Sequence, residues 1–236
     1  MKNRTEVLLV GVGNGGLGAL AWADYIKTQT NGKVRVLVDA GIWENDINDK
    51  TNDNYFEKRM KTLNKVFVNS GNFPNSKCQA ANPDNIEKCF YASELVKYVD
   101  PAVEVFFLQS YYDGWAMAEI LGLDCTEEFA SLSECTEKHR EAIQAYHKKI
   151  SDNMHEMVKL PNVRAFGISC VAHFFTHGRW DDEDFSVPME KNNTAVNIVN
   201  DWIHNKPRQI YLDEQPWPSN HPCSRKVVMK PNLVSE

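Results

Sequence analysis

A glycine-rich turn near the start of the chain limits what it can fold into more than any other feature. Residues 11–16 read GVGNGG and directly follow the apolar run VLLV of residues 7–10. An apolar run that ends on closely spaced glycines predicts a buried strand, a sharp backbone turn and then a helix. The sequence therefore predicts a strand over 6–10 and a helix over about 16–28.

Two unrelated kinds of protein use such a turn. One is the dinucleotide-binding turn G-x-G-x-x-G, here Gly11, Gly13 and Gly16, for which Asp39 would supply the acid that binds the ribose. The other is the nucleophile elbow G-x-S-x-G, which matches Gly11, Gly13 and Gly15. In the second interpretation Gly13 stands where the reacting serine belongs. The turn alone leaves both interpretations open.

Composition narrows the class of protein. The chain has 236 residues, of which 42% are hydrophobic, and this predicts one large globular domain. Its net charge is −6 and its lysines and arginines are scattered, so nucleic acid is not an expected partner. No apolar run approaches the roughly 18 residues of a membrane span. Close C-x-x-C spacing is absent, and neither a metal site nor a cofactor is expected.

Apolar runs alternate with helical periodicities along the chain. The predicted strands cover residues 6–10, 34–38, 103–108 and 163–167. The predicted helices cover about 16–28, 55–66, 113–121, 136–158 and 192–204. This alternation is typical of an α/β fold with a mostly parallel sheet.

Three candidate site positions follow predicted strands. They are the glycine turn, Asp113 and His173, in that order along the chain. Polar groups at the carboxyl ends of parallel strands carry the chemistry of such sheets, and the α/β-hydrolase triad runs Ser, Asp or Glu, His in the same order. Each residue also has a structural interpretation, since Asp113 could cap a helix and His173 could be a core histidine. As a triad remnant, the Asp113 carboxylate should lie about 2.6–3.2 Å from an imidazole nitrogen of His173.

The six cysteines fall into two close pairs and two remaining residues: 78 with 89, 125 with 135, then 170 and 223. Six cysteines allow 15 connectivities, and free thiols in a cytosolic protein are the alternative. The sequons at Asn3 and Asn192 favour a secretory history.

Together these segments resemble the pectin acetylesterase family, which includes the Notum carboxylesterases. The resemblance runs from about Glu6 to Cys223 and rests on five stretches besides the glycine turn: DAGI at 39–42, Cys78 with the CF of 89–90, FLQSYYDGW at 107–115, SCVAH at 169–173, and the tail of 218–223. It implies an α/β-hydrolase-like fold, with a mostly parallel sheet flanked by helices and lacking the N-terminal strands. Residues 1–236 would then be a single domain, equivalent to the C-terminal two-thirds of the family fold.

The resemblance also implies a disulfide-bonded serine esterase, secreted or in the endomembrane lumen. Asp113 would orient the imidazole, His173 would be the general base, and the backbone N–H of Asn14 would be one oxyanion donor. The nucleophile does not carry over, because Gly13 has no side chain. The predicted disulfides are Cys78–Cys89, Cys125–Cys135 and Cys170–Cys223.

The resulting functional prediction is a catalytically impaired member of this family, a pseudoenzyme that acts as a binding or structural component with an ester or carbohydrate ligand. One alternative is an active carboxylesterase that a missing N-terminal part or a partner chain completes. The other is a Rossmann-type dinucleotide-binding protein. A sheet without its first strands leaves an edge beside strand 6–10, and such an edge predicts pairing with an N-terminal segment or a protein partner.

Overall fold

One parallel sheet organises the protein, and its strands lie side by side in the order of the sequence. The computed structural model describes residues 6–70, 75–126, 132–178, 180–186, 193–206, 210–213 and 215. The five strands are β1 (Glu6–Val12), β2 (Lys33–Asp39), β3 (Val103–Asp113), β4 (Val163–Ala172) and β5 (Ile210–Leu212). Each pair of neighbours is parallel, so all the carboxyl ends lie along one edge of the sheet.

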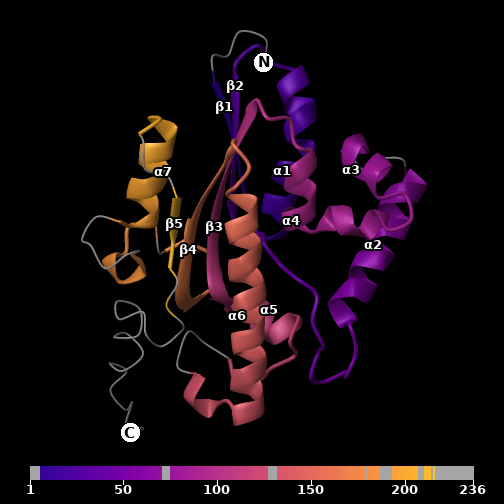
Figure 1. Ribbon diagram of the computed structural model, residues 1–236, viewed down its shortest axis with the longest axis vertical. Coiled ribbons are helices and arrows are strands. Elements are labelled where there is room, and N and C mark those ends of the chain that lie inside the picture. The colour runs from indigo at the N-terminus through magenta and orange to yellow at the C-terminus, as the bar shows by residue number, and fades with distance from the viewer. Residues whose placement is uncertain are drawn as a thin grey trace, which may run out of the picture.

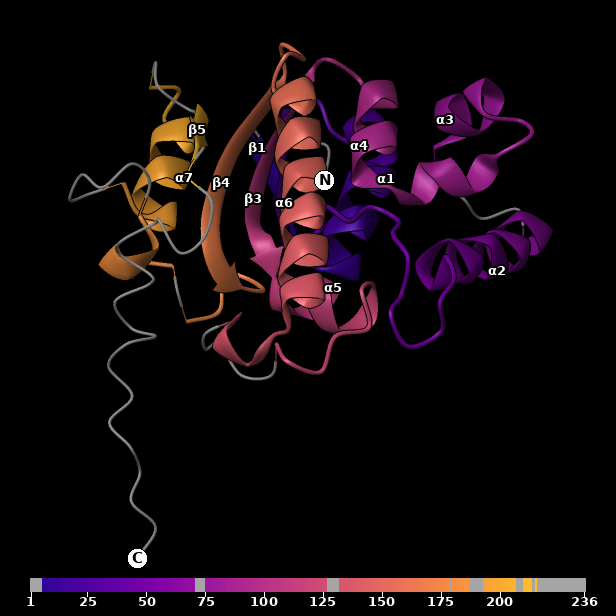
Figure 2. The same cartoon turned by 60° about the horizontal axis from the view of Figure 1, so that its bottom comes forward.

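Helices cover both faces of the sheet. The α-helices are α1 (Asn14–Thr28), α2 (Tyr55–Ser70), α3 (Ser76–Ala81), α4 (Ala92–Leu95), α5 (Gly114–Glu119), α6 (Glu137–Met157) and α7 (Ala195–Ile203). Short 3₁₀ turns are η1 (Ile86–Phe90), η2 (Val96–Tyr98), η3 (Leu132–Glu134) and η4 (Glu183–Phe185). Figure 1 shows α1, α4 and α6 on one side of the sheet and α7 on the other, and Figure 2 shows α2 and α3 out beyond α1 and α4.

The core is divided by the sheet into two apolar layers. The larger layer lies under α1, α4 and α6 and includes Val36, Phe107 and Tyr146. The smaller one lies under α7, where Trp202 packs on Phe106 with ring centroids 5.2 Å apart. Strands with apolar residues on both faces are expected for a parallel sheet covered on both sides.

The predicted α/β fold is correct, and the main differences lie at element ends. β3 continues to Asp113 and β4 to Ala172, several residues beyond the predicted ends. The last helix begins at Ala195 rather than at 192. β5, with three residues, and α4, with four, were not predicted, because such short elements carry no readable periodicity.

Two of the predicted disulfides are confirmed. Cys78 bonds to Cys89 and Cys125 bonds to Cys135. Cys223 lies outside the described residues, so its pairing with Cys170 stays a prediction. Disulfides persist in oxidising compartments, so the two observed bonds fit a secreted protein and argue against the cytosolic alternative. In the part of the chain that the structure describes, no helix is long and apolar enough to cross a membrane.

The Cys125–Cys135 bond should stabilise the protein measurably. The two cysteines are 10 residues apart, and closing a loop of that size removes about 2–3 kcal/mol of chain entropy from the unfolded state. We expect the double variant Cys125→Ser, Cys135→Ser to lose about that much unfolding free energy in urea titrations. An unchanged urea midpoint in the double variant would show that this loop contributes nothing to stability.

Candidate functional site

The carboxyl edge of the sheet brings the sequence-predicted residues together. In register, the last residue of β1 pairs with Asp39 at the end of β2. Asp113 at the end of β3 pairs with the last residue of β4, and His173 follows directly. Gly13 follows β1 at the same edge, where its N–H donates to the carbonyl oxygen of Asp39 at 2.8 Å.

The glycine turn has the backbone conformation of an elbow. Gly13 has φ 56° and ψ −125°, and α1 begins at the next residue. The Gly13 carbonyl accepts the N–H groups of Gly16 and Leu17, at 2.9 and 3.3 Å. Asn14, the predicted oxyanion donor, is the first residue of α1, where a backbone N–H has no partner within its own helix. The strand thus turns abruptly into the helix at Gly13.

Packing explains the other glycines of the turn. A Cβ on Gly11 would lie 2.0 Å from the carbonyl oxygen of Gly15, and one on Gly16 would lie 2.8 Å from Cγ1 of Val38. A Cβ on Gly13 would meet only the ring of Trp43, at an ordinary contact distance of 3.9 Å. Position 13 therefore has room for a side chain, and its positive φ is the remaining obstacle.

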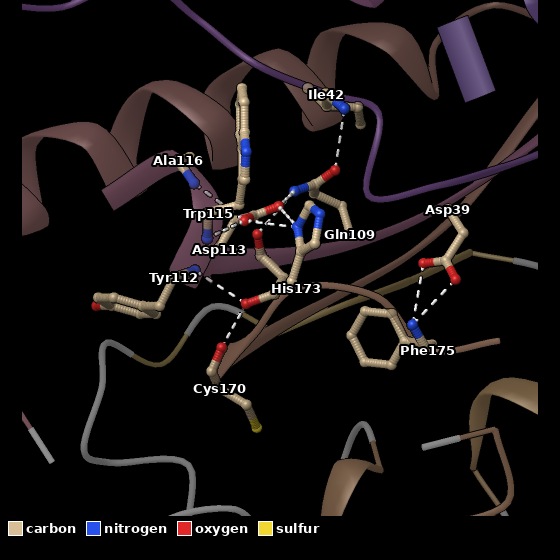
Figure 3. Close-up of polar contacts among 11 residues, drawn as sticks. Asp39, Ile42, Gln109, Tyr112, Asp113, Trp115, Ala116, Cys170, His173 and Phe175 are labelled. Carbon is tan, nitrogen blue, oxygen red and sulfur yellow. Dashed lines mark hydrogen bonds and ion pairs between the residues drawn. The ribbon is translucent and has the colours of Figure 1, made fainter. Parts of the chain in front are cut away.

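Asp113 and His173 form the expected hydrogen bond. The imidazole Nδ1 lies 2.8 and 2.9 Å from the two carboxylate oxygens (Figure 3). A carboxylate only accepts, so Nδ1 carries the proton and Nε2 is the basic nitrogen. The Asp113 side chain is 2% exposed and that of His173 is 25% exposed. The pair therefore has a buried acid that fixes the ring and a base that solvent or a ligand can reach, which is the geometry of general-base catalysis.

Asp113 also caps a helix, so both interpretations of this residue hold. Its Oδ1 accepts the N–H groups of Trp115 and Ala116, at 2.9 and 3.1 Å. Burial raises the pKa of the Asp113 carboxyl, and the bond to His173 opposes that rise. Gln109 adds a further contact, with its amide nitrogen 3.4 Å from Oδ2 and its amide oxygen accepting the N–H of Ile42 at 3.0 Å. Backbone and side-chain donors thus fix the carboxylate from several directions.

An irregularity in the β3–β4 ladder lies just before Asp113. The register shifts between Ser110 and Tyr112. The Ser110 hydroxyl bridges the shift, because it accepts the N–H of Tyr112 at 3.1 Å and donates to the carbonyl of Cys170. Bulges next to active sites change the direction of the side chains that follow. Here the residue that follows is the acid of the pair.

Asp39 holds the loop that carries His173. Its buried carboxylate accepts the N–H of Phe175 at 3.0 Å and both the N–H and the hydroxyl of Thr176, at 2.8 and 2.6 Å. Burial raises the pKa of the Asp39 carboxyl, and these hydrogen bonds oppose the rise.

Asp39 is fully buried, and its carboxylate oxygens are engaged by the loop that carries His173. The Rossmann alternative, in which Asp39 binds a ribose, is therefore wrong. Through its carbonyl Asp39 also contacts Gly13, so one residue joins the elbow to the histidine loop.

Removing the Asp39 carboxylate should loosen the His173 loop. We expect Asp39→Ala to lower the unfolding free energy by about 2–4 kcal/mol, because two backbone donors lose their acceptor. Amide hydrogen exchange should accelerate at Phe175 and Thr176. Asp124→Ala is the matched control, because that side chain is 77% exposed and should change stability very little. Equal effects of the two substitutions would contradict the anchoring role of Asp39.

Aromatic rings lie beside the pair. Trp115 stacks on the His173 imidazole, with centroids 6.2 Å apart and planes 24° apart. Trp43 contacts Trp115 at 4.8 Å, and Phe56 packs against both indoles. The position that a side chain on Gly13 would occupy is next to the Trp43 ring. Within the described ranges, no three His, Cys, Asp or Glu side chains are grouped so that they could hold a metal ion.

Sequence reasoning missed several residues that organise this site. It assigned Asp39 only to a ribose, and it did not identify Gln109 or Ser110. The sequence did offer one signal for Gln109 and Ser110, which is that both are polar residues next to a strongly apolar strand segment. Polar side chains that are buried in a sheet need hydrogen-bond partners, so such residues are candidates for a structural role in a site. The catalytic roles of Asp113, His173 and the Asn14 N–H stay predictions.

Comparison with known proteins identifies the family of this chain and confirms its fold. The family model described as Pectinacetylesterase matches residues 1–224. A search of curated proteins found no match. Two crystal forms of the Wnt deacylase Notum from Drosophila are similar in structure, with TM-scores of 0.70 and 0.69 and 17% sequence identity in each case. The first match covers 94% of this chain and 60% of the Notum chain, and the second covers 92% and 57%.

The structural similarity shows a shared fold, and this chain spans only about 60% of the length of the Notum chain. The family match covers nearly the whole sequence and includes the elbow and the segments that carry Asp113 and His173. This chain belongs to the pectinacetylesterase family.

Proposed function

We propose that the chain is an ester-binding member of its family that forms no acyl-enzyme. One observation carries the proposal: Gly13 keeps the elbow conformation, with φ 56° and ψ −125°, yet offers no oxygen to acylate. Removing a nucleophile serine typically lowers kcat by about 10⁶, and the remaining rate comes from substrate binding and the oxyanion donors. The covalent route is thus closed, whereas the groups that surround an ester remain.

Those groups are polar on one side and aromatic on the other. The Asp113–His173 pair offers Nε2 as an acceptor to a hydroxyl group of the ligand. Trp115 stacks on the imidazole with an angle of 24° between the ring planes, and Trp43 lies next to Gly13. Indole rings pack against apolar acyl groups and against the apolar faces of sugar rings. The family name points to acetyl esters of pectin as the ligand class, and Notum, a Wnt deacylase by name, points to a second class, acylated peptides.

Calorimetric titration tests this proposal directly. Acetylated oligogalacturonide and the same oligosaccharide after chemical deacetylation form a matched pair of ligands, and a fatty-acylated peptide represents the second class. We expect the acetylated oligosaccharide to bind at least about tenfold more tightly than the deacetylated one, since the acetyl group fills the space beside the indoles. Trp115→Ala should weaken that binding, whereas Trp22→Ala, on the outer surface of α1, should not. Equal affinity for the two oligosaccharides, and none for the acylated peptide, would contradict the proposed function.

The second candidate is an active carboxylesterase that needs further polypeptide. It is favoured by the part of the Notum chain that this chain does not match. Such an enzyme would have to obtain its nucleophile from outside the elbow, because Gly13 has no hydroxyl group. Ser110 and Ser169 are unsuitable, since both are fully buried in the sheet. Turnover of p-nitrophenyl acetate with an initial burst, in the unmodified chain or in its natural form, would favour this candidate over the ester-binding protein.

We also propose that the protein passes through the secretory pathway. The two disulfides and the sequons at Asn3 and Asn192 support this location. The natural protein should then carry N-linked sugar, and peptide-N-glycosidase should reduce its apparent mass. Fully reduced cysteines and no sensitivity to the glycosidase would place it elsewhere.

A further inference from the structure

Trp43 carries a buried hydrogen-bond donor that no described residue uses. Its side chain is 4% exposed, and its indole Nε1 has no hydrogen-bond partner among the described residues. The neighbouring rings of Phe56 and Trp115 offer only π faces, which accept weakly. A buried tryptophan N–H usually finds a partner, because a donor left unpaired loses the hydrogen bond that it makes with water in the unfolded chain. This exception therefore calls for an explanation.

The backbone on both sides of Trp43 is held by buried side chains. The N–H of Ile42 donates to the amide oxygen of Gln109 at 3.0 Å (Figure 3). The N–H of Glu44 donates to the hydroxyl of Tyr146 at 3.1 Å, and both acceptor side chains are buried. The position of the indole is thus set by its neighbours and needs no bond at Nε1. A donor that is fixed in advance loses little entropy when a ligand binds to it.

The unused donor lies beside the space that Gly13 leaves free. A Cβ on Gly13 would lie 3.9 Å from Cζ2 and 4.0 Å from Cη2 of Trp43. Apart from the neighbours of Gly13 in the chain, no other described atom would come within 4 Å of that Cβ. Cζ2 and Nε1 are both bonded to Cε2, so the N–H lies on the same edge of the indole. A small group of a ligand that enters this space therefore meets the edge of the ring that carries the donor.

We propose that Trp43 determines specificity for acyl groups, because its indole N–H donates to the carbonyl oxygen of the bound ester. This inference rests on the proposed function and names the ligand atom that the protein recognises. A carbonyl oxygen only accepts hydrogen bonds, so it needs a donor. The neutral imidazole of His173 offers an acceptor at Nε2 and cannot fill that role. The indole can, while its ring packs against the methyl group of an acetyl ester.

The burial of Nε1 makes this hydrogen bond selective. The indole N–H has no partner among the described residues and is shielded from solvent. A ligand oxygen that reaches it therefore replaces no hydrogen bond of that N–H, whereas at an exposed donor it would displace water. A ligand of the same shape without the oxygen leaves the donor unpaired. A site of this kind discriminates strongly against the analogue that lacks the polar atom.

A matched pair of ligands and a matched pair of proteins test the proposal together by calorimetry. One oligogalacturonide carries O-acetyl groups, and its counterpart carries O-ethyl groups, which have a similar size but lack the carbonyl oxygen. In one protein Trp43 is replaced by benzothienylalanine, in which sulfur takes the place of the indole N–H. The control protein carries the same replacement at Trp22, which is 47% exposed.

We expect the wild-type protein and the Trp22 control to bind the acetylated ligand at least about tenfold more tightly than the ethylated one. The replacement at Trp43 should abolish that preference, because sulfur cannot donate to the carbonyl oxygen. A preference that survives this replacement, or none in the wild type, would overturn the role of Trp43. If both ligands still bind more tightly than the deacetylated oligosaccharide, the proposed function stands without it. If neither does, the proposed function fails as well.

Nuclear magnetic resonance of the unmodified protein gives a second measurement that does not depend on a replacement that folds. The six tryptophans each have an indole N–H, and Trp43→Phe identifies the signal that belongs to Trp43. On saturation with the acetylated ligand, the Trp43 proton should move to higher frequency, because a new hydrogen bond forms. The signal of Trp202, in the apolar layer on the other face of the sheet, should stay in place. A Trp43 signal that does not move while the ligand is bound would overturn the proposal.

Discussion

Replacing Gly13 with serine is expected to raise the rate of p-nitrophenyl acetate hydrolysis by about 10³–10⁴ over the wild-type chain. Restoring the nucleophile of a triad is worth about 10⁶ in kcat. Each missing oxyanion donor typically lowers kcat by 10²–10³, and the Asn14 N–H is the one donor predicted here. Space is available, because the new Cβ meets only Trp43 at 3.9 Å. The positive φ of 56° should lower stability by about 1–3 kcal/mol.

Gly15→Ser is the matched control for this substitution. A Cβ on Gly15 meets nothing within 4 Å, so the control variant should fold, but its hydroxyl is two residues away from the elbow position. We expect its hydrolysis rate to equal that of the wild type. A folded Gly13→Ser variant that does no better than Gly15→Ser would show that the elbow no longer directs a side chain toward His173.

Trp202→Ala should be among the most destabilising single substitutions in the chain, at about 3–5 kcal/mol of unfolding free energy. Trp202 is 1% exposed, packs on Phe106 and lies under the guanidinium of Arg35, with 5.6 Å from Cζ to the ring centroid. Its loss would leave a cavity in the thinner of the two apolar layers. Urea titration of the isolated chain measures the change.

Trp22→Ala removes the same side chain from a site that is 47% exposed, so in the isolated chain it should change the unfolding free energy by less than about 1 kcal/mol. A loss below about 1 kcal/mol in the Trp202→Ala variant as well would mean that α7 adds little to the stability of the sheet.

The sequence was a good guide to the sheet because each of its long strands begins within a mainly apolar segment. The starts of β1 to β4 were predicted to within one residue, since residues such as Val34 and Val103 begin mainly apolar stretches that Arg35 and Glu104 interrupt only once each. Their ends were placed too early. The polar residues Gln109 and Ser110 interrupt the apolar pattern of β3, although both are buried and hydrogen-bonded inside the sheet. Tertiary hydrogen bonds of that kind leave no trace in local periodicity.

The sequence predicted the acid and the histidine of the candidate site, but it did not predict the residues that hold them in place. Asp113 and His173 lie in short segments that resemble the family, and the order of the strands brings these segments to one edge. Asp39 shows the limit of such reasoning. An acid that follows a strand and a glycine turn is a ribose ligand in one fold, whereas here it anchors the His173 loop. Only the position of Phe175 and Thr176 in space distinguishes the two roles.

Intact-protein mass spectrometry after treatment with a fluorophosphonate tests the central claim most directly. The claim is that a glycine at the elbow leaves the Asp113–His173 pair without a nucleophile to activate. The wild-type chain should gain no mass, and the Gly13→Ser variant should gain one adduct, located on residue 13 by peptide mapping. An adduct on the wild-type chain would contradict the claim, because it would reveal an activated nucleophile elsewhere in the protein.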